Sequence, residues 1–559
     1  MAYEPITTTE ELPDARHSAL TTVEVAGTVT QVGGTTVAIA LADHLAAPTQ
    51  IGDILTILTG TSLFIGEVGS LSLDGLGTTA QMTLLATVDT ERLTITPGIS
   101  NAPRTGSRVF HPSTTLLKAY LEDRRSLFDD LTHTVTIELG TSPLCPAHPL
   151  TFSPEKILGR HCAVVGTSGS GKSWTLARLL EQCANQGGKA ILIDPSGEYR
   201  TLSGPVRHVH IGTAPASLVS SSEVALPYYQ LTEADLVAIL RPTSATQITK
   251  LRAAIRSLKV LHLDPRLGIE GNLPKAHRLK APFEFALAEY QDEVCRPENA
   301  FNIHNLPMQV GLECVDPIRS HTESNYWGGI NVTDHNDCVP LISKLEDLTH
   351  STDLESILRP TQGESLLESI GNFLNDPSLK VLRVSCEYLP TINRVREIVS
   401  NALARHLLGL ARAGRFTNAP LILAVDEAHQ MLPTTTSLLS NEYPLEAFNV
   451  IAKEGRKYGL TLCVATQRPR DIPDDVLSQV GTFLVHRLVS DADRNAIERA
   501  SGAVSHALQT RLPSLAPGEA FLLGVDFHNP LRLRIERPNA TPLSDGPNFQ
   551  ASWGAATLQ

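Results

Sequence analysis

The chain has 559 residues, too many for one compact domain, so about three or four folding units are expected. Apolar residues make up 42% and charged residues 19%, an ordinary globular composition that excludes a disordered or fibrous chain. The 46 Lys and Arg against 59 Asp and Glu give a formal charge of −13, which excludes histone-like global attraction to nucleic acid. Any nucleic-acid contact therefore needs a local basic patch or a ring of identical subunits.

The N-terminal stretch MAYEPITTTEELPDARHS lacks a basic segment followed by an apolar one, the pattern of a secretory signal. The longest apolar runs, such as residues 421–425, are far shorter than the ~20 residues of a membrane span. The eight cysteines include no CxxC pair, and Cys145 with His148 is a weak metal signal without a second pair. We therefore expect a cytoplasmic protein with reduced thiols and no membrane anchor.

Strand and helix patterns along the chain predict several units. Val23, Val25 and Val29 alternate with polar or small residues before a Gly33-Gly34 hairpin, which favours a small β-barrel. A helix is expected over 116–130 and helical structure over 231–265, within a region of α/β pattern. The predicted units are a barrel at 1–115, a first part of an α/β core at 116–264, a helical insert at 265–375, a second part of the core at 376–540, and a tail, or an arm on a neighbour, at 541–559.

A glycine-rich loop is the strongest functional signal. Residues 166–173 read GTSGSGKS, a complete GxxxxGK[ST] motif between an apolar strand expected at 161–165 and a helix expected at 173–186. Glycines let backbone N–H groups converge on phosphate oxygens, Lys172 reaches the outer phosphates, and Ser173 ligates Mg²⁺. A glycine-rich turn with a chance lysine does not account for the full motif in this setting. The predicted ATP-binding residues are Gly166, Thr167, Ser168, Gly169, Ser170, Gly171, Lys172, Ser173 and the following Trp174.

An apolar strand ending in two acids supplies the second half of a hydrolytic site. Residues 421–427 read LILAVDE, and we expect Asp426 to hold the Mg²⁺ shell and Glu427 to orient and deprotonate the attacking water. The alternative is that the two acids only cap a strand end. Residues 426–429 spell DEAH, but the motifs of two-domain DEAH helicases do not surround them.

Two further positions complete the predicted set. Gln467 follows the strand expected at 460–466 and is the candidate sensor of the γ-phosphate, with a plain strand cap as the alternative. The basic cluster KEGRK at 453–457 would ordinarily be a solvated face. In a ring ATPase, however, an arginine here can enter the neighbour's site and stabilise transition-state charge, and Arg456 is the residue predicted to do so.

Taken together, these residues resemble the HerA family, hexameric DNA translocases of the FtsK–HerA group within the RecA-like ring ATPases. Besides the P-loop and the acidic pair, the matching segments lie in the same order along the chain. They are Arg160-His161, IDPSGEY at 193–199, GRKYG at 455–459 and QRP at 467–469, with IGD at 51–53 and PRTGSRV at 103–109 similar to the family's N-terminal barrel.

The resemblance implies an α/β, RecA-like P-loop ATPase core with an N-terminal HAS-barrel-like domain and an inserted helical subdomain. It also implies a homohexamer with ATP and Mg²⁺ at subunit interfaces and double-stranded DNA in the channel. In such a ring Lys172, Ser173, Asp426, Glu427 and Gln467 act in cis. Arg456 would be the trans finger, and Arg160 either a second interface arginine or a surface arginine at a strand edge. Asp194 and Glu198 would cap or bridge near the nucleotide without a catalytic role.

We therefore expect an ATP-dependent DNA translocase or helicase that serves DNA end processing or anti-phage defence. Family members work with a NurA-like nuclease, a sirtuin-like NADase or another nuclease, and the resemblance places such a partner on the barrel. The alternatives are an ATP-controlled scaffold that activates an effector with little translocation, and a ring that moves protein or RNA. Candidate pore residues, for which a solvated face explains each equally well, are Arg200, Arg207, Lys250 and Arg252.

Overall fold

Two units make up the computed structural model. Unit 1 comprises residues 1–157, 482–487 and 501–536, and unit 2 comprises residues 158–481, 488–500 and 537–559. The chain therefore passes between the units more than once. Within them the structure describes residues 20–42, 49–60, 62–74, 77–127, 135–215, 221–296, 299–351, 354, 357, 363–391, 394–432, 445–502 and 506–544.

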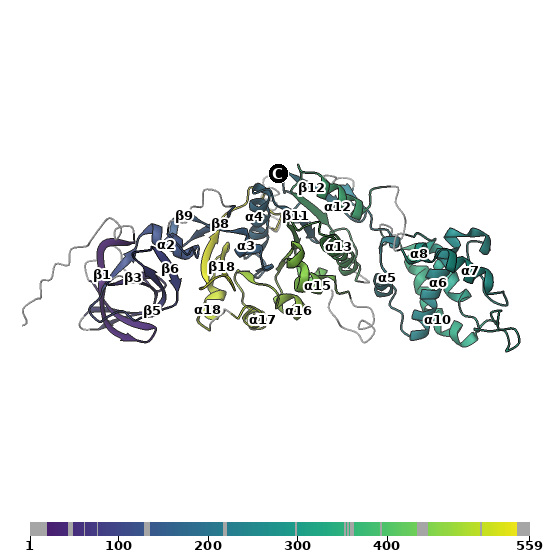
Figure 1. The fold of residues 1–559 in the computed structure, drawn as a ribbon, viewed down its shortest axis with the longest axis horizontal. Helices are drawn as coiled ribbons and strands as arrows, with labels where there is room; N and C mark the ends of the chain where they lie inside the picture. Colours follow the sequence, from purple (N-terminus) through teal and green to yellow (C-terminus); the bar gives the residue numbers. More distant parts are fainter. Residues whose placement is uncertain are drawn as a thin grey trace, which may run out of the picture. The chain divides into compact units, whose positions relative to one another are not determined.

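The N-terminal part of unit 1 is the predicted barrel (Figure 1). Six strands close in the order β2-β1-β7-β3-β4-β5, with β2 paired to β5 and β6 added beside β5. At Gly27 an added Cβ would lie 2.5 Å from the Ala40 carbonyl oxygen, so the missing side chain lets β1 and β2 approach. The strands are β1 (Thr21–Gly33), β2 (Thr36–Leu41), β3 (Ile54–Thr59), β4 (Ser62–Asp74), β5 (Gly77–Asp89), β6 (Thr94–Pro97) and β7 (Arg108–Pro112).

A helix follows the barrel but is shorter than the 116–130 expected. α2 (Thr114–Leu121) begins at the Ser113 cap and ends where Asp123 adopts a φ of 52°. The buried Glu122 carboxylate accepts hydrogen bonds from the Thr151 backbone N–H (2.8 Å) and hydroxyl (2.9 Å), which holds this turn against β9 (Cys145–Phe152). The expectation was wrong because a tertiary contact overrides the local helical pattern.

The rest of unit 1 is an antiparallel sheet in the order β17-β18-β19-β8-β9. Besides β9, its strands are β8 (Ile137–Ser142), β17 (Thr482–Val485), β18 (Glu519–Gly524) and β19 (Leu531–Ile535), and the short helices α3 (Pro154–Leu158) and α18 (His506–Arg511) also belong to this unit.

Unit 2 is built on a parallel sheet in the order β13-β12-β14-β11-β15-β16-β10. Its central strands are buried throughout, as expected for a parallel sheet covered by helices (Figure 1). Because every pair is parallel, the carboxyl ends of these strands meet at one edge. The strands are β10 (Cys162–Val165), β11 (Lys189–Asp194), β12 (Val206–His210), β13 (Ser222–Glu223), β14 (Val381–Ser385), β15 (Leu421–Val425) and β16 (Leu460–Thr466).

Helices of unit 2 connect these strands. They are α4 (Lys172–Asn185), α12 (Leu366–Asn375), α13 (Val395–Arg412), α14 (Ala428–Met431), α15 (Ala447–Glu454) and α16 (Asp474–Leu477), with α17 (Asp491–Ser501) near the C-terminal part. Among the described residues, no helix is both long and apolar enough to cross a membrane.

The inserted helical region has its own small core, in which Val260, Leu273 and Phe283 are buried. Lys275 is buried there too, with its Nζ 2.5 Å from Glu313 Oε2 and 4.6 Å from the centre of the Phe283 ring. Its helices are α6 (Ala245–Leu263), α7 (Ala281–Glu289), α8 (Gln291–Cys295), α9 (Leu306–Leu312) and α10 (Val332–His350), several of which are labelled in Figure 1.

The helical stretch expected over 231–265 is divided into two helices. α5 (Glu233–Leu240) ends at Arg241, whose φ of 46° is left-handed, and Pro242 follows before α6 begins. A proline disfavours the helical conformation in the residue before it, which explains why the helix stops here.

One buried ion pair joins two strands of the parallel sheet beside its carboxyl edge. Arg383 on β14 is 3% exposed, and its Nε donates a hydrogen bond of 2.7 Å to Asp194 Oδ2 at the end of β11. A neighbouring pair on β12, Arg207 with Glu364 at 2.5 Å, is partly exposed. The two pairs share chemistry but differ in burial.

We expect Arg383→Met to lower the free energy of unfolding by about 3–5 kcal/mol, because it leaves the buried Asp194 charge without its cationic partner. Arg207→Met is the matched control and should cost under ~1 kcal/mol, since its pair is solvated. Urea titrations of both variants measure the difference. Equal losses would show that burial of the Arg383 pair is not what stabilises this region.

Candidate nucleotide-hydrolysis site

The P-loop joins the end of β10 to the start of α4. Gly169 and Gly171 have φ values of 71° and 113°, left-handed conformations that favour glycine. The Ser170 hydroxyl donates a hydrogen bond of 2.6 Å to the Thr167 carbonyl oxygen, which closes the loop on itself. Lys172 is the first residue of α4 and is 6% exposed. The loop therefore presents backbone N–H groups and a lysine at a helix N-terminus, the arrangement that binds phosphates.

The predicted acidic pair follows β15, between β11 and β16 in the sheet. Asp426 is 1% exposed, and neither of its carboxylate oxygens has a hydrogen-bond partner among the described residues. Burial raises the pKa of Asp426 well above its usual range, and the negative charge of Glu427 raises it further. Burial also raises the pKa of Glu427, while the charge of Lys172 opposes that rise. The P-loop lysine and the acidic pair therefore meet at one edge of the sheet.

The loop after β11 carries the segment DPSGEY. Asp194 is fully buried, and its carboxylate accepts hydrogen bonds from the backbone N–H groups of Gly197 (2.8 Å) and Tyr199 (3.2 Å). Gly197 has a φ of 78°, which the tight turn requires. Asp194 thus organises this loop, which agrees with the capping role the resemblance implied for it.

Glu198 lies beside the predicted catalytic acids. Burial is the main cause of the raised pKa of Asp426 and of Glu427, and the negative charge of Glu198 is a smaller cause that raises both further. The Glu198 Oε2 atom is itself buried without a hydrogen-bond partner in the described structure. The sequence indicated no catalytic role for Glu198. Glu198 is four residues after Asp194, but its place beside Asp426 depends on the pairing of β11 with β15, so no local sequence signal indicated it.

These carboxylates fit a divalent cation. Asp426, Glu427 and Glu198 each have a buried oxygen without a hydrogen-bond partner among the described residues, beside Lys172 and the Ser173 hydroxyl of the P-loop. Several negative groups buried together are stable only when protonated or bound to a cation. Asp426, Ser173 and Glu198 are the residues that would hold Mg²⁺, which supplies charge neutralisation for the phosphates when it is bound.

The residues after β16 reach the same place. The backbone N–H of Gln467 hydrogen-bonds to Glu427, and the Arg468 charge is also close to that carboxylate. Gln467, the predicted sensor, therefore lies beside Glu427. Arg468 was not predicted as a site residue, although it directly follows Gln467 in the QRP segment.

The two predicted interface arginines have contacts of their own. Arg456 is exposed on a short 3₁₀ helix (Gly455–Tyr458). Burial lowers the pKa of His161, a hydrogen bond to a backbone carbonyl opposes this, and the positive charge of Arg456 lowers that pKa further. Arg160 is half-buried, and its carbonyl oxygen accepts a hydrogen bond of 2.6 Å from the Gly481 N–H. Their roles across a subunit interface remain predictions.

Three of the candidate pore residues are paired with carboxylates of the same chain. Arg200 Nη2 lies 2.7 Å from Glu387 Oε1, and Lys250 Nζ lies 2.8 Å from Asp334 Oδ2. Arg207 forms the pair with Glu364 described above. This pairing favours the alternative reading, in which these are surface charges.

A C-terminal segment runs along the nucleotide-binding side of unit 2. The Arg537 guanidinium lies 5.4 Å from the centre of the Trp174 ring, directly after the P-loop. The Asn539 backbone N–H donates to Glu181 on α4 at 3.0 Å, and the Leu543 N–H donates to the Glu198 carbonyl oxygen at 2.8 Å. The predicted tail therefore contacts its own chain up to Leu543, while residues 545–559 lie outside the described residues.

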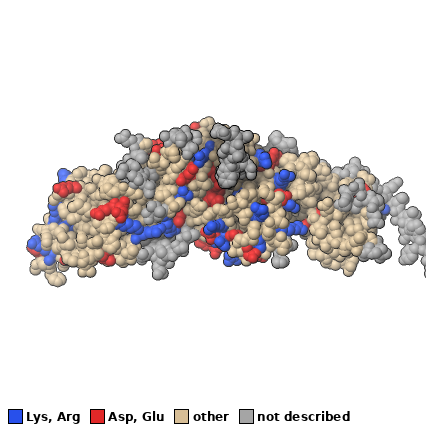
Figure 2. All heavy atoms as spheres, turned by 180° about the vertical axis from the view of Figure 1, so that it is seen from behind, with Lys and Arg blue, Asp and Glu red and all other residues tan. Residues whose placement is uncertain are grey.

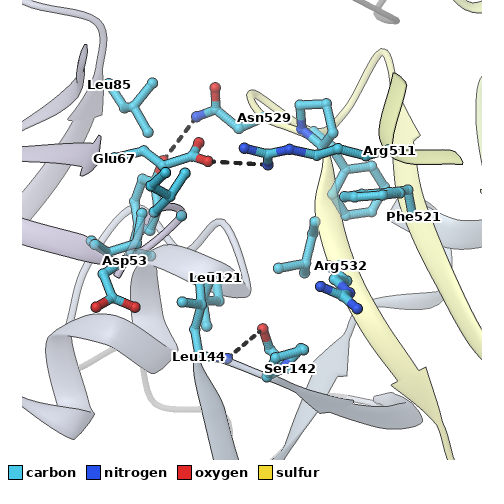
Figure 3. Close-up of a pocket in the computed structure, with 18 of the residues that line it drawn as sticks. Asp53, Glu67, Leu85, Leu121, Ser142, Leu144, Arg511, Phe521, Asn529 and Arg532 are labelled. Atoms are coloured by element: carbon cyan, nitrogen blue, oxygen red, sulfur yellow. Dashed lines mark hydrogen bonds and ion pairs between the residues drawn. The ribbon is translucent and has the colours of Figure 1, made fainter. Parts of the chain in front are cut away.

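Unit 1 contains a separate cavity of about 470 Å³, lined by barrel residues and by the region around β18 and β19 (Figure 3). Its charged groups are paired within the chain: Glu67 Oε1 lies 3.4 Å from Arg511 Nη1, and Asp123 Oδ1 lies 2.6 Å from His528 Nδ1. No described residue lining it has a buried side-chain oxygen or nitrogen without a partner. The unsatisfied carboxylates are instead at the P-loop edge of unit 2.

The remaining metal candidates carry no support. Cys145 is buried and forms no disulfide. The described residues contain no group of three His, Cys, Asp or Glu side chains that could hold a metal ion by themselves, so the Mg²⁺ set given above depends on the Ser173 hydroxyl as well as on carboxylates. A parallel sheet with a P-loop after β10, an acid pair after β15 and a polar residue after β16, the strand between them, defines a P-loop nucleoside triphosphatase.

Comparison with known proteins identifies the family. Residues 137–378 match the model described as "Helicase HerA, central domain", and residues 403–522 match the model described as "Helicase HerA-like C-terminal". The DNA double-strand break repair helicase HerA of Pyrococcus furiosus is 24% identical over 71% of this chain and 69% of its own length. The protein of the same name from Sulfolobus acidocaldarius is 22% identical over 71% of this chain and 69% of its own.

Solved structures with partial likeness include VirB4 of Thermoanaerobacter pseudethanolicus, 17% identical over 72% of this chain and 96% of that chain, with a TM-score of 0.45. The plasmid coupling protein TrwB in complex with a non-hydrolysable ATP analogue is 13% identical over 73% of this chain and 91% of that chain, with a TM-score of 0.43. The two family models together cover more than half of the chain. This protein belongs to the HerA helicase family, and it is an ATPase of the helicase and translocase type.

We expect Glu198→Gln to weaken divalent-cation binding about 10-fold, because it removes one negative charge from the carboxylates that would surround the cation. The measurement is the affinity for Mn²⁺ in the presence of ADP, followed by electron paramagnetic resonance. Glu454→Gln, which alters an exposed carboxylate in unit 2, is the control and should leave Mn²⁺ affinity unchanged. Unchanged affinity in Glu198→Gln would remove Glu198 from the cation site.

Proposed function

We propose that this chain is the subunit of a homohexameric ATPase that pumps double-stranded DNA through the centre of a ring. The observation that carries the proposal is the meeting of Lys172, Asp426 and Glu427 at the carboxyl edge of the parallel sheet. A protein that only binds nucleotide has no need of a base beside the γ-phosphate. Membership of a family named for helicases, and relatives named as DNA repair helicases, support DNA as the substrate.

Each residue of the site has a distinct task in the proposed hydrolysis. The P-loop N–H groups and Lys172 bind the β- and γ-phosphates, and Asp426 with Ser173 would hold Mg²⁺, which would supply charge neutralisation for these phosphates. Glu427 accepts the proton of the attacking water through its unpartnered Oε2. Gln467 senses the γ-phosphate from the neighbouring strand end. Arg456 of one subunit stabilises the transition-state charge in the next, with Arg160 in the same interface.

Assembly of a ring would concentrate positive charge for DNA binding. Figure 2 shows Lys and Arg side chains interleaved with Asp and Glu over the described face, with no continuous basic surface there. The net charge of −13 is also unfavourable for binding a phosphate backbone globally. Six copies of a few basic residues lining one channel would provide the local positive charge, and binding would then depend on salt and on assembly.

The proposed hexamer works with an effector, a nuclease or NADase, that docks on the N-terminal barrel, in DNA end processing or anti-phage defence. The competing proposal is that ATP controls assembly of a scaffold that activates the effector with little movement of DNA. Effector activity that survives Lys172→Ala would favour the scaffold, because that variant removes the phosphate-binding lysine. Loss of both effector activity and DNA movement would favour the motor.

We expect Glu427→Gln to lower the kcat of ATP hydrolysis by about 10²–10⁴-fold while ATP binding is retained, because the amide cannot accept the proton of water. Displacement of a triplex-forming strand from duplex DNA should stop in parallel. Radiolabelled ATP hydrolysis and ATP binding by filter retention provide the two measurements. Hydrolysis at the native rate in Glu427→Gln would reject the catalytic assignment.

We expect Arg456→Ala to lower kcat about 10³-fold or more if it is the trans arginine, and Lys457→Ala, its exposed neighbour, to serve as the control with near-native activity. Mixing Arg456→Ala subunits with Glu427→Gln subunits tests the direction of action. The mixture should regain activity, since an intact Glu427 then faces an intact Arg456 of the neighbour. A mixture as inactive as its components would show that Arg456 acts only within its own subunit.

A further inference from the structure

One nitrogen of His429 lies between two groups that compete for it. His429 Nδ1 is 3.2 Å from the hydroxyl of Thr466, with which it shares a hydrogen bond, and 3.3 Å from Oε2 of Glu427. The Glu427 Oε2 atom has no hydrogen-bond partner among the described residues. In this structure His429 is therefore bonded to Thr466, and the carboxylate oxygen beside it stays free.

Thr466 is hydrogen-bonded to the P-loop and to the loop after β16. It is the last residue of β16 and is fully buried. Its carbonyl oxygen accepts a hydrogen bond of 3.3 Å from the N–H of Gly166, the first residue of the P-loop. Its hydroxyl accepts a hydrogen bond of 3.0 Å from the N–H of Arg468. A shift of the P-loop or of the loop after β16 would thus move the hydroxyl that His429 contacts.

The proton arrangement follows from these donors. Because the Thr466 oxygen already accepts from the Arg468 N–H, its own hydrogen can be donated to His429 Nδ1, which then accepts and carries no proton. If the hydroxyl turns away, the neutral ring can adopt its other tautomer, in which the proton has moved from Nε2 to Nδ1, and the Nδ1–H can donate a hydrogen bond to Glu427 Oε2. A carboxylate oxygen that accepts this hydrogen bond is less basic and is held in one position, so it is a weaker base for the attacking water.

We propose that His429 is a positioning residue that restrains the catalytic glutamate, and that Thr466 keeps it from doing so by occupying the same nitrogen. The inference rests on the proposed role of Glu427 as the base. Hydrolysis would then depend on the contact between His429 and Thr466. A shift of the P-loop or of the loop that carries Arg468 would change that contact and, through His429, the availability of the Glu427 carboxylate. His429, the last residue of the DEAH segment at 426–429, would thus have a role that differs from its role in the DEAH helicase motif.

The surroundings favour a neutral imidazole, as this exchange requires. Burial lowers the pKa of His429, and the positive charges of Arg468 and Lys172 lower it further, while Asp471 opposes them. Glu427 faces the ring from the start of α14, and Thr466 faces it from β16. A charged imidazolium would hold Glu427 in every state, whereas the neutral ring can take either partner.

The test is a double-mutant cycle on kcat and KM for ATP in the full-length protein. We expect Thr466→Val to lower kcat about 10- to 100-fold with KM within about twofold of native, because His429 is then free to bind Glu427. Thr466→Ser, which keeps the hydroxyl, should retain most of the activity. In a His429→Ala background, Thr466→Val should change kcat by less than about twofold, since the restraining group is gone.

Independent losses in the cycle would overturn the inference, because they would show that Thr466 and His429 act separately on the fold or the loop. Thr482→Val is the control for removing a buried strand threonine that bonds to a carbonyl oxygen, and it should not change kcat. Thermal unfolding of each variant identifies any loss due to misfolding. If Glu427→Gln remains fully active, the proposed function itself fails, whereas an inactive Glu427→Gln with an additive cycle rejects only this inference.

Discussion

The burial of several carboxylates at one edge of a parallel sheet is the constraint on which the rest of this structure depends. Asp194 is neutralised by Arg383 and by backbone N–H groups, so it can order its loop without a ligand. Asp426, Glu427 and Glu198 each keep at least one buried carboxylate oxygen without a hydrogen-bond partner in the described structure. A bound cation would relieve their mutual repulsion. The folding of this edge and the binding of a metal–nucleotide complex would then be linked equilibria.

Sequence patterns located the site where its signals are local. The GTSGSGKS loop and the LILAVDE strand each carry their own strand and turn context, so their meeting at one edge follows from the rule for parallel sheets. The role of Glu198 was missed because it requires β11 and β15 to be neighbours, which the order of strands along the chain does not indicate. The contact of His429 with Thr466 likewise joins two separate elements.

The errors in secondary structure have similar causes. The expected helix over 116–130 carries a helical pattern, but the buried Glu122 finds its donors on β9 and the helix stops. The break at Arg241 was readable from Pro242, a local signal outweighed by the apolar residues around it. Whether a single basic residue such as Arg200 or Arg207 is free to bind DNA could not be predicted from the sequence. Its acidic partner can lie far away in the chain, as Glu364 lies more than a hundred residues from Arg207.

The segment from Arg537 to Leu543 has a consequence for biosynthesis. It contacts Trp174, Glu181 and Glu198, yet it follows the P-loop, the acidic pair and the strand of Thr466 in the sequence. A ribosome therefore releases every catalytic group before the residues that lie against α4. A growing chain therefore holds its phosphate-binding loop without the support of these residues until they have been synthesised and have reached α4.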